Sequence, residues 1–99
     1  MDDVIALIRE TYADDGIKQK IPTETTREVF ASVSSVSRAE WRNAGLNGLQ
    51  PSFVAVMPIV NYDGEKLVEW RGVRYAVYRT YFRADSDEIE IYLEERTGT

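Results

Sequence analysis

The stretch EWRGVRYAVYRTY, residues 69–81, interleaves positive charge with aromatic rings. Its basic residues are Arg71, Arg74 and Arg79, and its aromatic residues are Trp70, Tyr75, Tyr78 and Tyr81. Rings that stack on bases and guanidinium groups that contact phosphates are the chemistry of single-strand nucleic-acid binding. The same pattern is typical of a strand whose arginines face acids on its neighbours, so the surrounding strands decide between the two interpretations.

Two hairpin registers favour the second interpretation. A two-residue turn at Arg71-Gly72 would pair Trp70 with Val73, Glu69 with Arg74 and Val68 with Tyr75. A turn at residues 84–87 would pair Arg83 with Glu88, Phe82 with Ile89, Tyr81 with Glu90, Arg79 with Tyr92 and Tyr78 with Leu93. Because these registers bring base beside acid and apolar beside apolar, we expect the arginines to be engaged within the protein.

The two registers bury opposite faces of the strand that they share. Its apolar face before the midpoint is Val73, Tyr75 and Val77, and after the midpoint it is led by Tyr78 and Phe82. A strand that changes its buried face must bend or bulge, as strands do in small barrels and sandwiches. We therefore predict a bend near Val77 and Tyr78 in a mostly β fold. The expected architecture is a small antiparallel β-barrel or sandwich with one short helix or loop insertion at about residues 37–51.

Other residues that could do chemistry are few. The chain has no histidine and no cysteine, which removes imidazole and thiol chemistry and disulfides. Asp85, Asp87 and Glu88 lack the spacing and glycine of a calcium loop and fit a turn, as do Asp14-Asp15-Gly16 and Asp63-Gly64. We expect no catalytic, cofactor-binding or metal-binding residue, and therefore no enzyme and no cofactor.

Charge and length narrow the class further. The 99 residues suit one domain, residues 1–99, and 17 acids against 12 bases give a net charge of -5 that repels a polyanion at long range. Acids dominate residues 1–15 and 85–99, whereas bases dominate residues 16–84, a division that could serve pairing within one molecule or between copies. The acidic N-terminus and the short apolar run at residues 53–60 predict a soluble protein without a membrane contact.

The segments before residue 53 do not all have strand character. Residues 4–12 fit a strand or a helix equally well, and residues 25–33 have strand character. A capping pair, Ser37 with Glu40, predicts a helix from Arg38 to Ala44 that Gly45 closes, followed by an irregular segment at residues 45–51.

The later segments predict strands with tight turns. Pro58 indicates an edge strand or a bulge, and Asp63-Gly64 is a hairpin signal. Residues 53–60 are apolar on both faces, so this strand is either fully covered or completed by another chain. The short helix offers little to bury Trp41, which either closes one end of the barrel or anchors a protein interface.

In order and spacing, residues 23–95 resemble the head-tail joining proteins of tailed bacteriophages, also called head-closure, adaptor or stopper proteins. The matching pieces are Ser37 with Glu40 and Ala44, Gly48-Leu49-x-Pro51, Tyr62 with Gly64-Glu65, and Gly72-x-x-Tyr75-x-x-Tyr78-Arg79. The role of residues 1–20 stays open, because the resemblance hardly includes them.

The resemblance implies a structural protein that forms a homo-oligomeric ring in the virion, beneath the portal. Such a ring extends or closes the DNA channel after packaging and offers the tail its attachment surface. Implied partners are a portal or adaptor ring and a tail-completion protein, and DNA passes without sequence-specific binding. Assembly in the host cytoplasm, from a monomer or otherwise, would precede its place at the head-tail junction.

By this analogy the segment from Ser37 to Pro51 projects from the barrel, and Trp41 and Leu46 change environment on assembly. The expected interface residues are Arg38, Glu40, Trp41, Arg42, Leu46, Leu49 and Phe53. The competing hypothesis is a small β-barrel binding module for single-stranded nucleic acid or a peptide.

Overall fold

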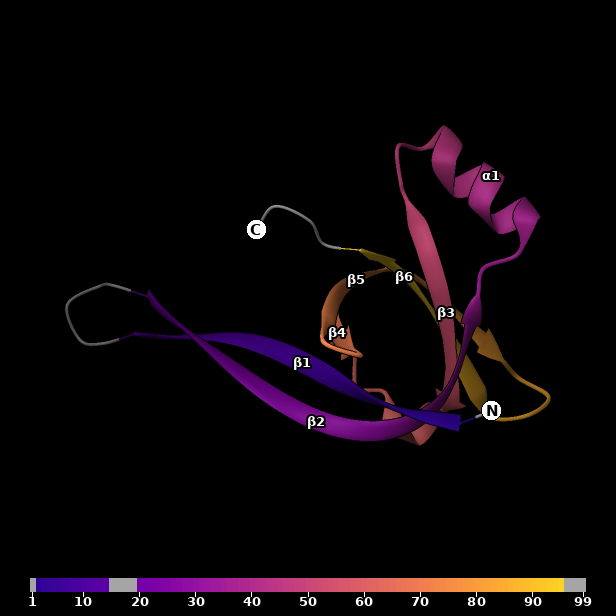
Figure 1. Ribbon diagram of the computed structural model, residues 1–99. Coiled ribbons are helices and arrows are strands. Elements are labelled where there is room, and N and C mark those ends of the chain that lie inside the picture. The colour runs from indigo at the N-terminus through magenta and orange to yellow at the C-terminus, as the bar shows by residue number, and fades with distance from the viewer. Residues whose placement is uncertain (1, 15–19, 96–99) are drawn as a thin grey trace.

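Six strands close into one antiparallel barrel in the order β1-β2-β3-β6-β5-β4 (Figure 1). The computed structural model describes residues 2–14 and 20–95. Its elements are β1 (Asp2–Asp14), β2 (Lys20–Ser35), α1 (Arg38–Leu46), β3 (Pro51–Pro58), the 3-10 turn η1 (Ile59–Asn61), β4 (Leu67–Trp70), β5 (Val73–Arg83) and β6 (Glu88–Glu95). The expected mostly β fold, a small antiparallel barrel with one short helix, is confirmed. The ambiguous segment at residues 4–12 is part of a strand.

The barrel core comes from period-two alternation, because successive side chains of a strand point to opposite faces. The buried core residues are Ile5, Leu7, Ala31, Ala55, Met57, Val68, Tyr75, Ile89, Ile91 and Leu93. The rings of Phe53 and Trp70 pack against this core and meet edge to face, with centroids 4.7 Å apart. The indole N–H of Trp70 donates to Asp3 Oδ2 at 2.9 Å, so the polar end of this ring is also satisfied.

The predicted registers hold except at one residue. All three predicted pairs of β4 with β5 and four of the five pairs of β5 with β6 are confirmed. The pairing of Tyr78 with Leu93 is wrong, because Val77 faces Leu93, Arg79 faces Tyr92, and Tyr78 is the extra residue of a β-bulge. The bend predicted near Val77 and Tyr78 is therefore present. As a result of the bulge, Tyr78 and Arg79 both project from the outer face. The prediction that Tyr78 and Phe82 lead the buried face of this half of β5 is therefore wrong: Tyr78 points outward, and Phe82 is 60% exposed although it pairs with buried Ile89.

Two predictions for the middle segment, a hairpin at Asp63-Gly64 and an edge strand or bulge at Pro58, differ from the structure. Asp63-Gly64 does not form a hairpin, because β3 pairs with β2 and β6 and has no contact in register with β4. Gly64 still has φ 84°, so it supports a bend in the loop that crosses to β4. Pro58 ends a central strand, where its missing N–H costs no ladder bond, and the irregular pairing of β3 lies between Pro51 and Phe53.

Helix α1 begins where the capping pair predicted. The Oγ of Ser37 accepts the backbone N–H of Glu40 at 3.1 Å. The helix continues past Ala44 and Gly45 to Leu46, so the predicted end is two residues early. Gly48, with φ 78°, is the glycine that leaves the helix, one residue beyond the C-cap Asn47.

The first two strands are longer than the barrel needs. β1 pairs with β4 only at Ala6–Ile8, and β2 pairs with β3 only at Ser32–Ser35, whereas β1 pairs with β2 along its full length, residues 2–14 with residues 20–32. Beyond Ile8 the two strands continue as a two-stranded arm, residues 9–14 and 20–25, which extends away from the barrel (Figure 1). The loop expected at Asp14, Asp15 and Gly16 falls outside the described residues, apart from the backbone of Asp14 at the end of β1.

The turn at Arg71-Gly72 has positive φ at both residues, 53° and 78°, as a type I′ hairpin turn requires. We expect Gly72→Ala to lower the free energy of unfolding by about 1 kcal/mol, because an added Cβ has free space but the left-handed backbone disfavours it. Gly45→Ala is the control, since Gly45 is helical with negative φ and equally free space. This replacement should stabilise by up to about 1 kcal/mol. Equal signs in urea denaturation would contradict the turn assignment.

Candidate functional site

Helix α1 is fastened to the barrel by one carboxylate. The Oε2 of Glu40 accepts the hydroxyl of Tyr78 at 2.7 Å, and Arg79 Nη2 donates to its Oε1 at 2.5 Å. The hydrogen bond from Arg79 is the main cause that holds the pKa of Glu40 below its ordinary value, against the opposing effect of burial. Tyr78 and Arg79 can reach the same carboxylate because the bulge turns both outward, so the strand irregularity positions the helix.

The contact continues along the outer face of β6. The guanidinium carbon of Arg79 lies 4.0 Å from the ring centre of Tyr92, a cation–π distance. Tyr92 donates its hydroxyl to Glu90 at 2.5 Å, and Arg83 Nε donates to the other oxygen of Glu90 at 2.6 Å. Burial raises the pKa of the Tyr92 hydroxyl, and its bond to Glu90 adds to this effect.

The arginines of residues 69–81 are engaged by the protein itself, as expected. Arg79 lies over its predicted neighbour Tyr92, but Arg74 does not pair with the predicted acid Glu69. Arg74 Nη1 lies 2.9 Å from Glu24 of β2, rather than pairing with Glu69 opposite it. Arg71 lies over the ring of Trp70, with its guanidinium carbon 4.6 Å from the ring centre, and 3.5 Å from Asp3. The strand register therefore predicted that these arginines contact the protein itself. Because arginine side chains are long, Arg74 binds an acid other than its register partner, and Arg71 reaches Asp3 from the turn.

One face of α1 carries arginines that have no such partner among the described residues. Arg38, Trp41 and Arg42 share this face by their helical spacing, and all three are exposed. Trp41 keeps 62% of its surface in solvent. Neither arginine forms an ion pair with any residue that the structure describes. These three residues, together with Val36 and the end of β2, line a shallow groove of about 620 Å³.

The remaining predicted interface residues are divided. Leu46 is 81% exposed, and Leu49, three residues later, is half-buried. Glu40 is turned toward the barrel, and Phe53 packs against the core with Trp70 and Tyr75. The structure thus brings Arg38, Trp41, Arg42 and Leu46 to the surface and uses Phe53 and Glu40 for packing and attachment.

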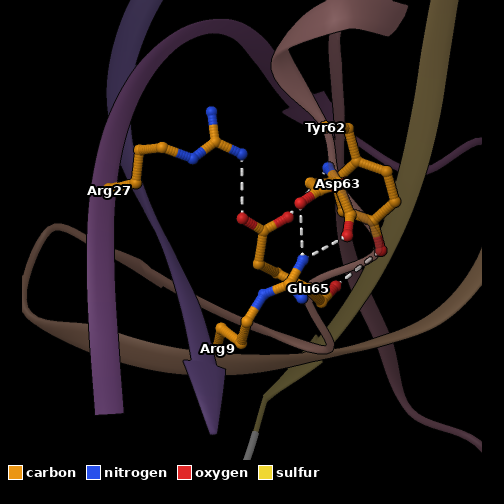
Figure 2. A network of polar contacts seen from close by, with 5 residues as sticks. All are labelled: Arg9, Arg27, Tyr62, Asp63 and Glu65. Carbon is orange, nitrogen blue, oxygen red and sulfur yellow. Dashed lines mark hydrogen bonds and ion pairs between the residues drawn. The ribbon is translucent and has the colours of Figure 1, made fainter. Parts of the chain in front are cut away.

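A second polar network fixes the base of the arm, and sequence reasoning missed it (Figure 2). Glu65 is nearly buried, and Arg27 of β2 donates to its Oε2 at 2.8 Å while the backbone N–H of Asp63 donates to its Oε1 at 2.9 Å. Arg9 of β1 contacts the carboxylate of Asp63 at 2.8 Å. The hydroxyl of Tyr62 donates to the carbonyl of Glu65 at 2.5 Å. One loop between η1 and β4 therefore contacts both β1 and β2 at the base of the arm.

Burial alone would raise the pKa of Glu65, but the hydrogen bond from Arg27 and the backbone donors outweigh it and hold the pKa below its ordinary 4.5. The carboxylate is therefore charged at neutral pH, with its partner on β2. The one signal in the sequence is the short spacing of Tyr62 and Glu65 around Gly64, which does not reveal a partner as distant as Arg27.

Two exposed apolar residues were also missed. Val4 of β1 and Phe30 of β2 face each other in register and are 43% and 68% exposed. Their places in alternation with buried Ile5 and Ala31 could have shown that they point outward.

Within residues 2–14 and 20–95, no group of three or more acidic, histidine or cysteine side chains is arranged to hold a metal ion. Among the helices of the same ranges, none has the length and apolar character needed to cross a bilayer.

No protein-family model matches this chain, and no curated protein does.

The attachment of α1 through Glu40 predicts a local effect. Replacing Glu40 by alanine removes an acceptor of two hydrogen bonds, one of them charge-assisted, and should speed amide exchange in residues 38–46 by about tenfold or more. Hydrogen–deuterium exchange measures this. Arg42→Ala, on the same helix but without a partner among the described side chains, is the matched control and should leave exchange nearly unchanged. Equal acceleration in both variants would contradict the attachment.

Proposed function

We propose that this chain is a structural protein of the head-tail connector of a tailed bacteriophage. In this proposal, copies of the chain form a ring beneath the portal, extend or close the DNA channel after packaging and provide the tail attachment surface. The support is the ordered resemblance over residues 23–95, together with a fold of the kind that this resemblance implies: a small closed barrel carrying a short helical insertion.

The observation that carries the proposal is the division of the molecule into a closed body and projecting parts. A closed barrel has no free strand edge in its body, so neighbours cannot extend its sheet and must contact its outer face or the parts that project from it. The projecting parts are the arm of β1 and β2 and helix α1, on which Trp41 and Leu46 expose large apolar surfaces (Figure 1). Exposed apolar side chains on a projecting element favour a protein that assembles with others.

The charge arrangement is compatible with a channel through which DNA slides. The chain carries a net charge of -5. Six arginines have acidic partners within the protein: Arg9, Arg27, Arg71, Arg74, Arg79 and Arg83. Guanidinium groups that are already paired offer less to phosphates, which favours passage of DNA over retention.

One observation favours the competing function, a binding module for single-stranded nucleic acid. Trp41 between Arg38 and Arg42 offers a ring for stacking and two cations for phosphates. In that case the chain should bind an oligodeoxythymidylate with an affinity that falls steeply with salt, and Trp41→Ala should abolish binding. A connector protein should show neither effect at the salt concentration of the cytoplasm.

The test is electron microscopy of particles from a phage or induced prophage with a stop codon early in this gene. We expect heads that have lost their DNA beside detached tails, and recovery of tailed virions when the chain is supplied in trans. Normal, infectious, tailed particles without the chain would refute the placement at the head-tail junction.

A further inference from the structure

Two surfaces of the chain have opposite charge, and each also exposes apolar side chains. The first, here called the basic groove, is formed by Arg38, Trp41 and Arg42 of α1 with Val36 beneath them. One aromatic ring and two cations line this groove of about 620 Å³. Nothing else in the described part of the chain neutralises these two arginines through an ion pair.

The second surface, here called the acidic face, lies on the outside of the barrel. Val4 and Phe30 are register partners, and Ala6 is in register with Glu28 on one side and Glu69 on the other. Residues that face each other across strands, or alternate along one strand, share a side of the sheet. The exposed apolar pair, Val4 and Phe30, is therefore bordered by the two exposed carboxylates Glu28 and Glu69.

The spacings of the two surfaces agree. Arg38 and Arg42 are separated by about 6 Å along the helix axis, from the rise per helical residue. Glu28 and Glu69 lie two strands apart, about 9–10 Å at the usual strand spacing. Arginine side chains are long enough to span this difference, so Trp41 can meet Phe30 while each cation meets a carboxylate.

We propose that the basic groove of one copy receives the acidic face of a second copy of this chain. Helix α1 and the barrel portions of β1 and β2 lie on different parts of the molecule, so the contact joins unlike surfaces head to tail (Figure 1). Contacts of this type form a ring when the rotation between copies closes. The contact between two copies is inferred from the two surfaces alone. That such contacts close into a ring in the virion rests on the proposed function.

Cysteine trapping tests the contact directly, because the chain has no cysteine of its own. Gly45 lies one helical turn beyond Trp41, has free space for a side chain, and becomes Gly45→Cys in one batch of protein. A second batch carries Val4→Cys in the acidic face. Mixed at high concentration and oxidised, the two should give several times more disulfide-linked heterodimer than Gly45→Cys mixed with Ala84→Cys, a control in an exposed turn.

Charge reversal adds a second readout. Arg38→Glu with Arg42→Glu in the Gly45→Cys chain should reduce trapping to the control level, and Glu28→Lys with Glu69→Lys in the Val4→Cys chain should restore it. Because Glu69 faces Arg74, the melting temperature of each variant is checked, and Glu28→Lys alone serves if the double variant does not fold.

Trapping equal to the control in the unreversed pair, or reversal without rescue, would overturn this contact. Salt-sensitive binding of an oligodeoxythymidylate that requires Arg38 and Arg42, without trapping, would instead assign the groove to nucleic acid. Neither result depends on phage particles, so failure here is separate from failure of the placement at the head-tail junction.

Discussion

Replacing Ile91 by alanine is expected to lower the free energy of unfolding by about 2–5 kcal/mol. Ile91 is 0% exposed on β6, between Ala55 of β3 and Thr80 of β5 in register. Because Ala55 is itself too small to fill the space, the three lost carbons leave a cavity in the middle of the closed barrel. Urea denaturation should show a lower midpoint with an unchanged slope, since the folded barrel exposes the same surface on unfolding.

Val60→Ala is the matched control for this variant. Val60 lies in η1 and is 89% exposed, so loss of its methyl groups should change the free energy of unfolding by less than about 0.5 kcal/mol. A loss at Ile91 no greater than that at Val60 would mean that the core of the barrel is not the one described.

The second large effect is expected at the base of the arm. Arg27→Met keeps an apolar stem but removes the guanidinium group, leaving the nearly buried carboxylate of Glu65 without its cation. We expect a loss of about 2–3 kcal/mol, below the range for fully buried pairs because Arg27 is itself 44% exposed. Arg9→Met, the same replacement in the exposed pair with Asp63, should cost about 1 kcal/mol or less.

The difference between wild type and Arg27→Met should also depend on pH. The folded-state pKa of Glu65 is held below its ordinary 4.5, so the stabilisation from its charged form is present above that pH and is lost as the pH falls through the folded value. The two proteins should therefore converge in stability below about pH 4.5. A constant difference down to strongly acidic pH would show that Arg27 contributes packing and no charge interaction with Glu65.

Much of the fold follows from local patterns because antiparallel hairpins are local. The turn at Arg71-Gly72 and alternation along β5 and β6 were enough to predict the register and the bend at Val77 and Tyr78, but not which side chains are buried beyond the bend. The error at Tyr78 has the same origin, because arithmetic without a bulge must give every residue a partner. Asp63-Gly64 failed for another reason: a glycine turn resembles a hairpin signal whether the chain returns to its own strand or crosses to another.

The candidate site was less predictable because its contacts are distant in sequence. The sequence left Trp41 either closing one end of the barrel or anchoring an interface, and the structure leaves it 62% exposed. The attachment of Glu40 to Arg79 was not predicted, since it depends on how a bulge directs side chains. The pairing of Arg27 with Glu65 joins residues of β2 to a loop before β4, a contact that appears only after the barrel closes. Local propensity carries no information on such pairs.

The most direct test of the connector function is electron cryomicroscopy of the head-tail joint in intact virions of a phage that carries this gene. We predict a ring of identical barrels around the channel beneath the portal, each fitted by the six strands and helix α1 described above. A joint built entirely of other chains, with this protein absent from purified virions, would contradict the connector function.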